Sequence, residues 1–306
     1  MLINKIITPE YITQLKGKIF FNHSLSDYTS WKSGGPADCL YIPDSLEELQ
    51  TFLKSLPSSV PVTYLGLGSN TLVRKKGVEG VVIVTQSGLN KITQVSETEV
   101  FAQAGVSSAQ LARYTARLGL SGLEFLAGVP GTVGGALAMN AGCNGSETWE
   151  HVSKVDTINA SGDILQRNLT DFSVSYRHVG RPPNEWFSAG YFKLSPSTKE
   201  AALKKIRDLL EHRNATQPTG TANCGSVFKN PPGDYAGRLI EQCGLKGKTL
   251  RSAQVSSKHA NFIVNIDPDT QTCSEDIEQL ILEVATIVLQ KTSVRLIPEV
   301  CIIGRL

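Results

Sequence analysis

Residues 128–142 read Gly-Val-Pro-Gly-Thr-Val-Gly-Gly-Ala-Leu-Ala-Met-Asn-Ala-Gly, which places five glycines in fifteen positions. Apolar residues separate these glycines, whereas serines would separate them in a flexible linker. Glycines at this density let a backbone approach a ligand closely and supply N–H donors without side-chain crowding. The alternative is a tight structural crossing between packed strands. The candidates for cofactor binding in this segment are Gly128, Gly131, Thr132, Gly134, Gly135, Asn140 and Gly142.

A second glycine-rich turn, Gly66-Leu-Gly-Ser-Asn-Thr71, follows a predicted strand at 62–66. It does not match the dinucleotide-binding fingerprint, because Thr71 replaces the third glycine and no amphipathic helix begins there. The functional alternative is a turn whose backbone N–H groups face a pyrophosphate. Two such segments in one mixed domain favour a large, flat, phosphorylated cofactor over a single phosphate. The candidates from this turn are Gly66, Gly68, Ser69 and Asn70.

The composition is that of an ordinary globular protein with two or three domains: 306 residues, 41% apolar, 19% charged, with a net charge of +2. The absence of a basic stripe argues against nucleic acid as a partner and leaves small anions, such as phosphates and carboxylates. Six cysteines without a Cys-x-x-Cys pair indicate reduced thiols, with neither a zinc site nor a disulfide framework. No signal peptide and no apolar run approaching eighteen residues is visible, so we expect a cytoplasmic protein without membrane insertion.

The predicted elements are those of an α+β protein, without the regular alternation of a doubly wound fold. Residues 36–85 are predicted as strand, helix, strand and strand, and the helix starts at a capping box, Ser45-Leu-Glu-Glu48. Hairpins are predicted at 89–104 and 152–169, and a helix opens at Ser195–Thr198 and ends near Arg213. Further elements are a short helix at 236–243, a strand at 259–266, a long helix at 274–290 and a terminal strand at 293–303.

Three kinds of polar group lie close together in Gly225-Ser-Val-Phe-Lys-Asn-Pro231. Ser226 can donate a proton, Lys229 can hold an anion, and Asn230 can bind a polar ring edge. The alternative is a surface turn that enters a strand, and this segment alone does not exclude it.

Two further charged residues are candidates whose function depends on where they point. Arg177, beside Tyr176, is either a packed surface residue or a two-pronged ligand for an anion. Glu299 follows Pro298 inside the apolar run 296–303, so it lies either on a solvent-facing edge or in a site. His259 is one of five scattered histidines without metal spacing, and we expect it to be structural.

Taken together and in this order, the segments resemble the UDP-N-acetylenolpyruvoylglucosamine reductase family over roughly residues 22–303. The motifs that carry the resemblance are Leu25–Trp31 with Gly34–Ala37, Gly68–Asn70, Met139–Gly142, Tyr176-Arg177, Gly225–Pro231, Ala236–Glu241 with Gly244–Gly247, His259–Asn261 and Pro298-Glu299. The spacing after Arg177 resembles the shorter form of the family. The chain departs from the usual pattern at Ser30, Val179 and Cys224, none of which removes a chemical group that the reaction needs.

The resemblance implies three regions: an N-terminal extension at 1–21, an FAD-binding region of the vanillyl-alcohol oxidase (PCMH) type at 22–200, and a smaller α+β substrate-binding domain at 210–306. The FAD-binding region would have two lobes, at about 22–85 and 86–200, and the domain boundary would fall at about 200–215. Neither glycine-rich turn contains a histidine, so we expect FAD to be held without a covalent bond.

The resemblance also implies the reaction: NADPH-dependent reduction of UDP-N-acetylglucosamine enolpyruvate to UDP-N-acetylmuramate, in peptidoglycan synthesis, by a monomer. Arg177, Ser226 and Glu299 would be catalytic. Tyr176, Lys229, Asn230 and Arg213 would bind the substrate. The alternatives are an FAD-dependent sugar or alcohol oxidase on the same scaffold and a non-catalytic protein that binds FAD or a UDP-sugar.

Overall fold

The computed structural model of the chain describes residue 7, residues 13–268 and residues 273–306. The chain divides into two compact units, each described here by itself. The first comprises residues up to Phe21, Cys39–Leu67 and Gly80–His212, and the second comprises Asn22–Asp38, Gly68–Glu79 and Arg213–Leu306. The predicted extension at 1–21 lies largely outside the described residues. The functional domain limits expected from the sequence stay a prediction.

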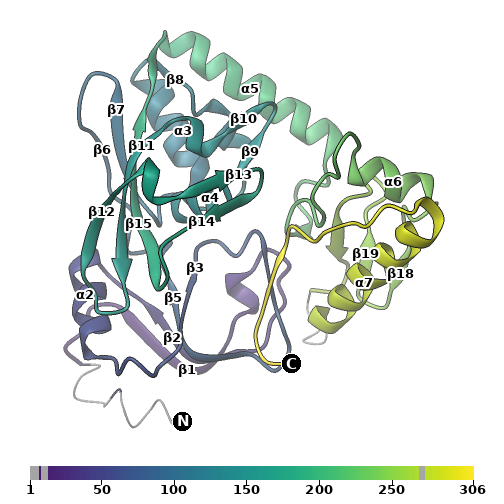
Figure 1. Cartoon of the computed structure of the whole chain (residues 1–306), viewed down its shortest axis with the longest axis horizontal. Coiled ribbons are helices and arrows are strands. Elements are labelled where there is room, and N and C mark those ends of the chain that lie inside the picture. The colour runs from purple at the N-terminus through teal and green to yellow at the C-terminus, as the bar shows by residue number, and fades with distance from the viewer. Residues whose placement is uncertain (1–6, 8–12, 269–272) are drawn as a thin grey trace. The chain divides into compact units, whose positions relative to one another are not determined.

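Two sheets form the framework of the first unit (Figure 1). One has the order β1-β2-β5-β3, with bounds Lys18–Ser24, Pro36–Ile42, Val78–Val84 and Val62–Leu65. The other is antiparallel, with the order β12-β11-β15-β7-β6 and bounds Ile164–Asn168, Val152–Asn159, Glu185–Lys193, Glu99–Gln103 and Ile92–Gln94. The predicted hairpins at 89–104 and 152–169 are confirmed as β6–β7 and β11–β12.

Helix α2 (Leu46–Ser55) begins where the sequence predicts, but only half of the capping box forms. Ser45 Oγ accepts the Glu48 N–H at 3.2 Å, as an N-cap does. The Glu48 carboxylate does not return to the N-cap N–H. It accepts hydrogen bonds from the N–H groups of Lys16, Gly17 and Asp44 and from the Tyr41 hydroxyl. Burial raises the pKa of Glu48, but these hydrogen bonds outweigh it and leave the pKa below its ordinary value.

Helices α3 (Ser108–Arg117) and α4 (Val133–Met139) contribute the main core of the first unit together with the short helix η3 (Glu124–Gly128). Helix α5 (Lys199–Thr216) adds Ala202 and Ile206 to this core. It continues three residues past the predicted end near Arg213, and the division between the two units falls within it. The short elements are β8 (Leu120–Ser121) with β16 (Ser195–Pro196), β9 (Gly142–Cys143) with β10 (Ser146–Glu147), β13 (Ser173–Ser175) with β14 (His178–Gly180), η4 (Thr148–Glu150) and η5 (Leu169–Asp171).

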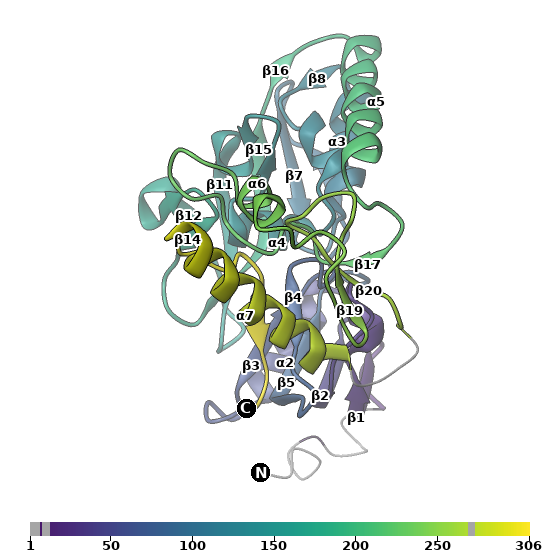
Figure 2. The ribbon, with the colours of Figure 1, turned by 90° about the vertical axis from the view of Figure 1, so that its right-hand side faces the viewer.

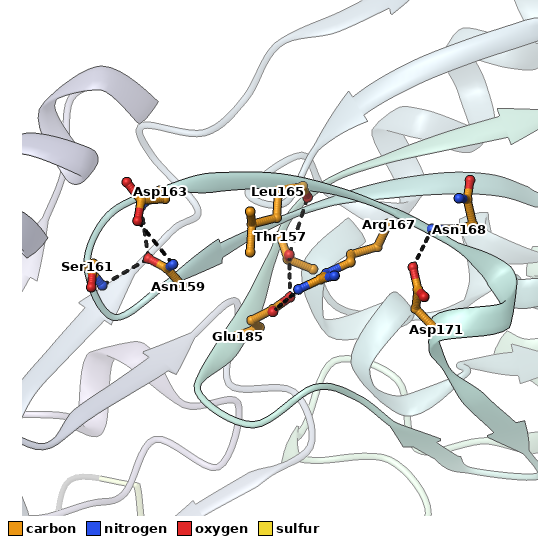
Figure 3. A network of polar contacts seen from close by, with 9 residues as sticks. All are labelled: Thr157, Asn159, Ser161, Asp163, Leu165, Arg167, Asn168, Asp171 and Glu185. Atoms are coloured by element: carbon orange, nitrogen blue, oxygen red, sulfur yellow. Dashed lines mark hydrogen bonds and ion pairs between the residues drawn. The ribbon is translucent and has the colours of Figure 1, made fainter.

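An ion pair whose carboxylate is buried joins the β11–β12 hairpin to β15 (Figure 3). The Glu185 carboxylate accepts hydrogen bonds from Nε and Nη2 of Arg167 and from the Thr157 hydroxyl. The hydrogen bond from Arg167 is the main reason that the pKa of Glu185 lies below its ordinary value. At the hairpin turn, Asn159 Oδ1 accepts the N–H groups of Ser161 and Asp163 at 2.9 Å each, which is an Asx turn (Figure 3).

The second unit is built from a sheet with the order β17-β20-β19-β18 and from helices α6 (Ala236–Gln242) and α7 (Cys273–Thr292). The strands are Ala222–Asn223, Ile263–Asn265, Ala253–Val255 and Thr249–Leu250, and α7 packs beside them (Figure 2). Strand β4 (Thr71–Val73) pairs in parallel with β21 (Cys301–Ile303). The predicted helices at 236–243 and 274–290 are confirmed.

Two strand predictions in the second unit are wrong in extent. Within the predicted strand at 259–266, residues 259–262 form a turn, in which the Phe262 N–H donates to the His259 carbonyl at 3.0 Å, and β20 begins only at Ile263. Within the predicted strand at 293–303, only β21 is regular, and Pro298 makes an isolated bridge with Phe228. Proline cannot donate to a ladder, so the regular pairing cannot extend through this residue.

Trp31 ties residues 22–38 into the second unit. Its side chain is fully buried in one core with Leu72 and Ile263. Trp31 Nε1 donates to the Ile263 carbonyl at 2.8 Å, and Asn265 Nδ2 donates to the Trp31 carbonyl at 2.7 Å. A buried indole therefore has its polar atom satisfied while it fills the core.

Candidate active site

The turn at 259–262 holds the segment that carries Ser226. The Val227 N–H donates to the Asn261 carbonyl at 2.8 Å. The Asn261 side chain bonds both backbone groups of Phe228: Oδ1 accepts the N–H at 3.0 Å and Nδ2 donates to the carbonyl at 2.8 Å. Val227, Phe228 and Asn261 are buried, whereas Ser226 is half-buried. The backbone next to Ser226 is therefore fixed, while the hydroxyl lies nearer the surface.

Glu299 lies against the other side of the same segment. Its N–H donates to the Val227 carbonyl at 2.8 Å, and the Lys229 N–H donates to the Ile297 carbonyl at 2.9 Å. Asn70 Nδ2 donates to the Glu299 carbonyl at 3.1 Å. The structure thus brings Ser226 and Glu299, which are 73 positions apart in the sequence, onto adjacent segments of the second unit.

Ser226 and Asn230 line a pocket of about 450 Å³ within the second unit. The other polar residues around it are Tyr235, Arg238, Glu241, Lys258, His259 and Asn261. Burial is the main cause that lowers the pKa of His259, so its imidazole is neutral near pH 7, and Nδ1 accepts the Asn261 N–H at 3.3 Å. The wall combines the Lys258 ammonium and the Arg238 guanidinium, which is bonded to Asp234, with the Glu241 carboxylate.

The three predicted substrate-binding residues of the second unit occupy different positions. Lys229 is half-buried and belongs to the same segment as Ser226, residues 226–229. Asn230 lies six positions before helix α6, and its Oδ1 accepts the N–H of Ala236, the first helical residue, at 3.0 Å. Arg213 lies on the last turn of α5, where Nε donates to Gln217 Oε1 at 3.2 Å.

The residues just before Ser226 explain how the chain changes direction before residues 226–229. Gly225 has a φ of +74°, a left-handed conformation that glycine adopts without strain. Cys224 is buried, and burial raises the pKa of its thiol to about 12. The thiol is therefore protonated and packs as a small apolar group, which is why cysteine can stand at this position.

Arg177, the third predicted catalytic residue, lies in the first unit on the two-residue turn between β13 and β14. It adopts a φ of +54°, and its guanidinium lies over the Tyr176 ring at 4.8 Å from the centroid. Nη2 donates to the Gly142 carbonyl at 2.6 Å and Nη1 donates to the Asn140 carbonyl at 3.4 Å. The cation is thus held at the end of the glycine-rich segment, and it is not a loose surface residue.

Asn140 and Glu147 build the support for Arg177. Asn140 follows α4 at a φ of +42°, and its buried side chain donates to Glu147 Oε2 at 2.6 Å and accepts the Trp149 N–H at 3.1 Å. Glu147 Oε1 lies 3.8 Å from Arg177 Nη1. The sequence placed Asn140 among the cofactor contacts. The structure gives its side chain a supporting position, and a direct cofactor contact stays a prediction.

The two glycine-rich segments meet at one point of the first unit. A Cβ on Gly66 would lie 2.3 Å from Thr132 Oγ1, so only glycine fits there. Thr132 is also the N-cap of α4 and accepts the Gly135 N–H at 3.5 Å. The Gly134 N–H, in contrast, donates to the Ala104 carbonyl at 2.9 Å, which favours the structural interpretation for that glycine.

The turn after Gly66 has the donors that a phosphorylated cofactor needs. Within the described parts of the chain, the backbone N–H groups of Gly68 and Asn70 have no hydrogen-bond acceptor, and Gly68 is buried. A buried N–H without a partner is costly, so a turn of this kind fits an anionic ligand oxygen. The residues present therefore fit FAD.

Comparison with known proteins supports the same family from the whole chain. Residues 37–167 match the FAD binding domain, and residues 217–303 match the C-terminal domain of UDP-N-acetylenolpyruvoylglucosamine reductase. The chain is 51% identical to that reductase of Legionella pneumophila (strain Lens), with 97% of this chain and 96% of the relative covered. It is 46% identical to that of Coxiella burnetii (strain Dugway 5J108-111), with 97% and 99% covered. The chain belongs to the UDP-N-acetylenolpyruvoylglucosamine reductase family.

A solved structure of the family has the same fold. The crystal structure of the reductase from Thermus caldophilus matches with a TM-score of 0.77 at 32% identity, covering 95% of this chain and 100% of that one. The predicted α+β class, with an FAD-binding region of the vanillyl-alcohol oxidase type, is confirmed. The chain is an FAD-dependent oxidoreductase that acts on UDP-N-acetylglucosamine enolpyruvate in peptidoglycan synthesis.

Two kinds of feature are absent from the described residues. No helix there is both long and apolar enough to cross a membrane. In the same ranges, no group of three or more His, Cys, Asp or Glu side chains is arranged to hold a metal ion.

Proposed function

We propose that NADPH is the reductant and that Arg177, Ser226 and Glu299 carry the chemistry on the enolpyruvyl group. FAD, when bound, would supply the hydride chemistry, from NADPH to the terminal methylene carbon of the substrate. The observation that carries the proposal is the backbone pairing that places Ser226 and Glu299 on adjacent segments. A cytoplasmic location and a monomeric state belong to the same proposal.

Arg177 and Glu299 stabilise the negative charge that develops on the substrate. Addition of hydride to the methylene carbon moves an electron pair toward the carboxylate and gives an enolate-like species. Arg177 offers it a cation whose orientation is already set by the carbonyls of Asn140 and Gly142. Glu299, in its protonated form, donates a hydrogen bond to the same charge.

Ser226 delivers the proton that completes the reduction. The proton goes to the carbon that bears the ether oxygen and the carboxylate. A hydroxyl is a very weak acid, but the enolate-like species is strongly basic, so a fixed hydroxyl suffices. The held backbone of residues 227 and 228 supplies the rigidity that this transfer needs.

The remaining candidates bind the ligands. Lys229, Asn230, Tyr176 and Arg213 hold the UDP-sugar, and its nucleotide end fits the pocket that Asn230 lines. FAD is held without a covalent bond by the backbone and side chains of both glycine-rich segments, namely Gly66, Gly68, Ser69, Asn70, Gly128, Gly131, Thr132, Gly135 and Gly142.

Separate measurement of the two half-reactions of Ser226→Ala tests the proton donor. Reduction of the flavin by NADPH should stay near the parent rate, because no proton from Ser226 is needed. Reoxidation by the enolpyruvyl sugar should fall by about 100-fold or more, the scale of a lost general acid. Ser252→Ala removes another serine hydroxyl from the second unit, one that is bonded to Asp276, and is the control. Parent-like reoxidation of Ser226→Ala would move the donor role to Glu299.

The same apparatus separates this function from its alternatives. A sugar or alcohol oxidase would be reduced rapidly by a sugar alcohol and not by NADPH. A non-catalytic binder would keep a reduced flavin in the presence of the enolpyruvyl sugar under anaerobic conditions. Either result would overturn the proposed reaction.

A further inference from the structure

Asn261 is the one described residue whose side chain bonds both backbone groups of Phe228. Asn261 is 4% exposed and Phe228 is 1% exposed, so both hydrogen bonds are buried. An amide offers one acceptor and one donor at a fixed spacing, as a backbone peptide does. The Asn261 side chain therefore continues strand-like pairing where the turn at 259–262 has ended the regular ladder.

We propose that Asn261 is a positioning residue that sets the orientation of Ser226 and its register with Glu299. Val227 stands between Ser226 and Phe228, and its N–H donates to the Asn261 carbonyl at 2.8 Å. The Val227 carbonyl accepts the Glu299 N–H at 2.8 Å. Asn261 thus fixes the peptide groups that lie between Ser226 and the segment of Glu299. This inference rests on the proposed function of Ser226.

The position of Asn261 is itself fixed from the pocket side. Its N–H donates to Nδ1 of His259, at 3.3 Å, and burial keeps this imidazole neutral. An aspartate here would keep the acceptor for the Phe228 N–H but would set a carboxylate oxygen against the Phe228 carbonyl. A leucine of similar size would leave both buried backbone groups without partners. Either change would free the backbone next to Ser226.

Asn261→Leu tests the inference, with Asn265→Leu as its matched control. Asn265 is 3% exposed in the same unit, and its side chain also joins two backbone groups, the Trp31 carbonyl and the Asp267 N–H. Both variants lose two hydrogen bonds, of which the one from Asp267 to Asn265 is part-buried, but only Asn261 contacts the segment of Ser226. Comparable losses of thermal stability are expected from both.

Stopped-flow half-reactions then separate positioning from stability. In Asn261→Leu, reoxidation of the reduced flavin by UDP-N-acetylglucosamine enolpyruvate should fall by about 100-fold, the effect of a misplacement of about 1 Å. Its solvent deuterium isotope effect should rise, because proton delivery becomes the slow step. Reduction by NADPH should match the parent, and Asn265→Leu should match the parent in both half-reactions.

Three outcomes would overturn the inference: parent-like reoxidation of Asn261→Leu, an unchanged isotope effect, or equal slowing in Asn265→Leu. If either leucine variant does not fold, Asn261→Asp and Asn265→Asp give the same comparison, because each keeps the acceptor and replaces the donor. Ser226→Ala distinguishes failure of this inference from failure of the proposed function. If Ser226→Ala is slow while Asn261→Leu is fast, the inference fails and the proposed function stands. If Ser226→Ala is fast, the proposed function fails.

Discussion

Lys229, which we propose binds the substrate, stands on a fixed backbone, because its N–H donates to the Ile297 carbonyl and the side chain of the next residue, Asn230, accepts the Ala236 N–H. We expect Lys229→Ala to raise the KM for the UDP-sugar by about 10-fold or more, since a hydrogen bond to a charged group is worth about 1.5–3 kcal/mol. The kcat and the flavin content should change little. Steady-state kinetics and the flavin absorbance measure both. Loss of flavin in this variant would contradict its assignment to the substrate.

At the scale of single residues, the sequence identified the groups with obvious chemistry and missed those that hold them. Ser226, Lys229 and Glu299 are visible because a hydroxyl, an ammonium and a carboxylate stand in unusual surroundings. Asn261 and Glu147 carry no such signal, because Asn261 acts through hydrogen bonds to a residue 33 positions away and Glu147 through an ion pair with one 30 positions away. Local patterns contain no information on such partners.

At the scale of elements, the β11–β12 hairpin depends on the carboxylate of Glu185. In the folded chain the pKa of Glu185 is lowered from 4.5, mainly by the hydrogen bond from Arg167. The carboxylate therefore contributes its full stabilisation above pH 4.5. The contribution is lost as the pH falls through the folded pKa. Glu185→Gln should therefore lower the free energy of unfolding by about 1–3 kcal/mol at pH 7 and by much less at acid pH.

Urea unfolding of Glu185→Gln at pH 7 and at about pH 3 checks this expectation. Glu97→Gln, at the exposed turn of the β6–β7 hairpin, is the control and should have no effect at either pH. An equal loss of stability at both pH values would show that the carboxylate charge is not what holds the hairpin.

Elements set by local signals were predicted better than elements set by distant partners. The hairpins and helices α6 and α7 follow from periodicity and turn residues, and they form where expected. The apolar runs at 259–266 and 293–303 have the composition of strands, but Asn261 and residues 297–300 contact Gly225–Pro231 irregularly, and only β20 and β21 are regular strands. Composition could not show that these runs frame a site.

At the scale of the whole molecule, Trp31 is the residue whose loss should reveal how the second unit is assembled. Trp31→Ala should cost about 3–5 kcal/mol, because it leaves a cavity in the core and removes the bond to the Ile263 carbonyl. Hydrogen exchange should quicken at the amides of β19 and β20. Trp149→Ala, which empties a buried site in the first unit, should leave those amides protected. Equal exchange in the two variants would contradict this expectation.

The sequence placed a domain boundary near 200–215 but did not show that residues 22–38 and 68–79 join the C-terminal part of the chain. Nothing in the composition of those segments separates them from their neighbours. Their membership is decided by the indole of Trp31 and by the pairing of β4 with β21.

The second unit combines early and late segments of the chain, and this affects its folding during synthesis on the ribosome. Trp31 and its partner Ile263 are separated by 232 positions. At about 5–20 residues per second, the indole leaves the ribosome about 10–50 s before its acceptor exists. During that interval an aromatic side chain and the apolar strand β4 have nowhere to pack. The nascent chain should therefore engage a holding chaperone through these early segments. The second unit can fold completely only after β21 has been translated.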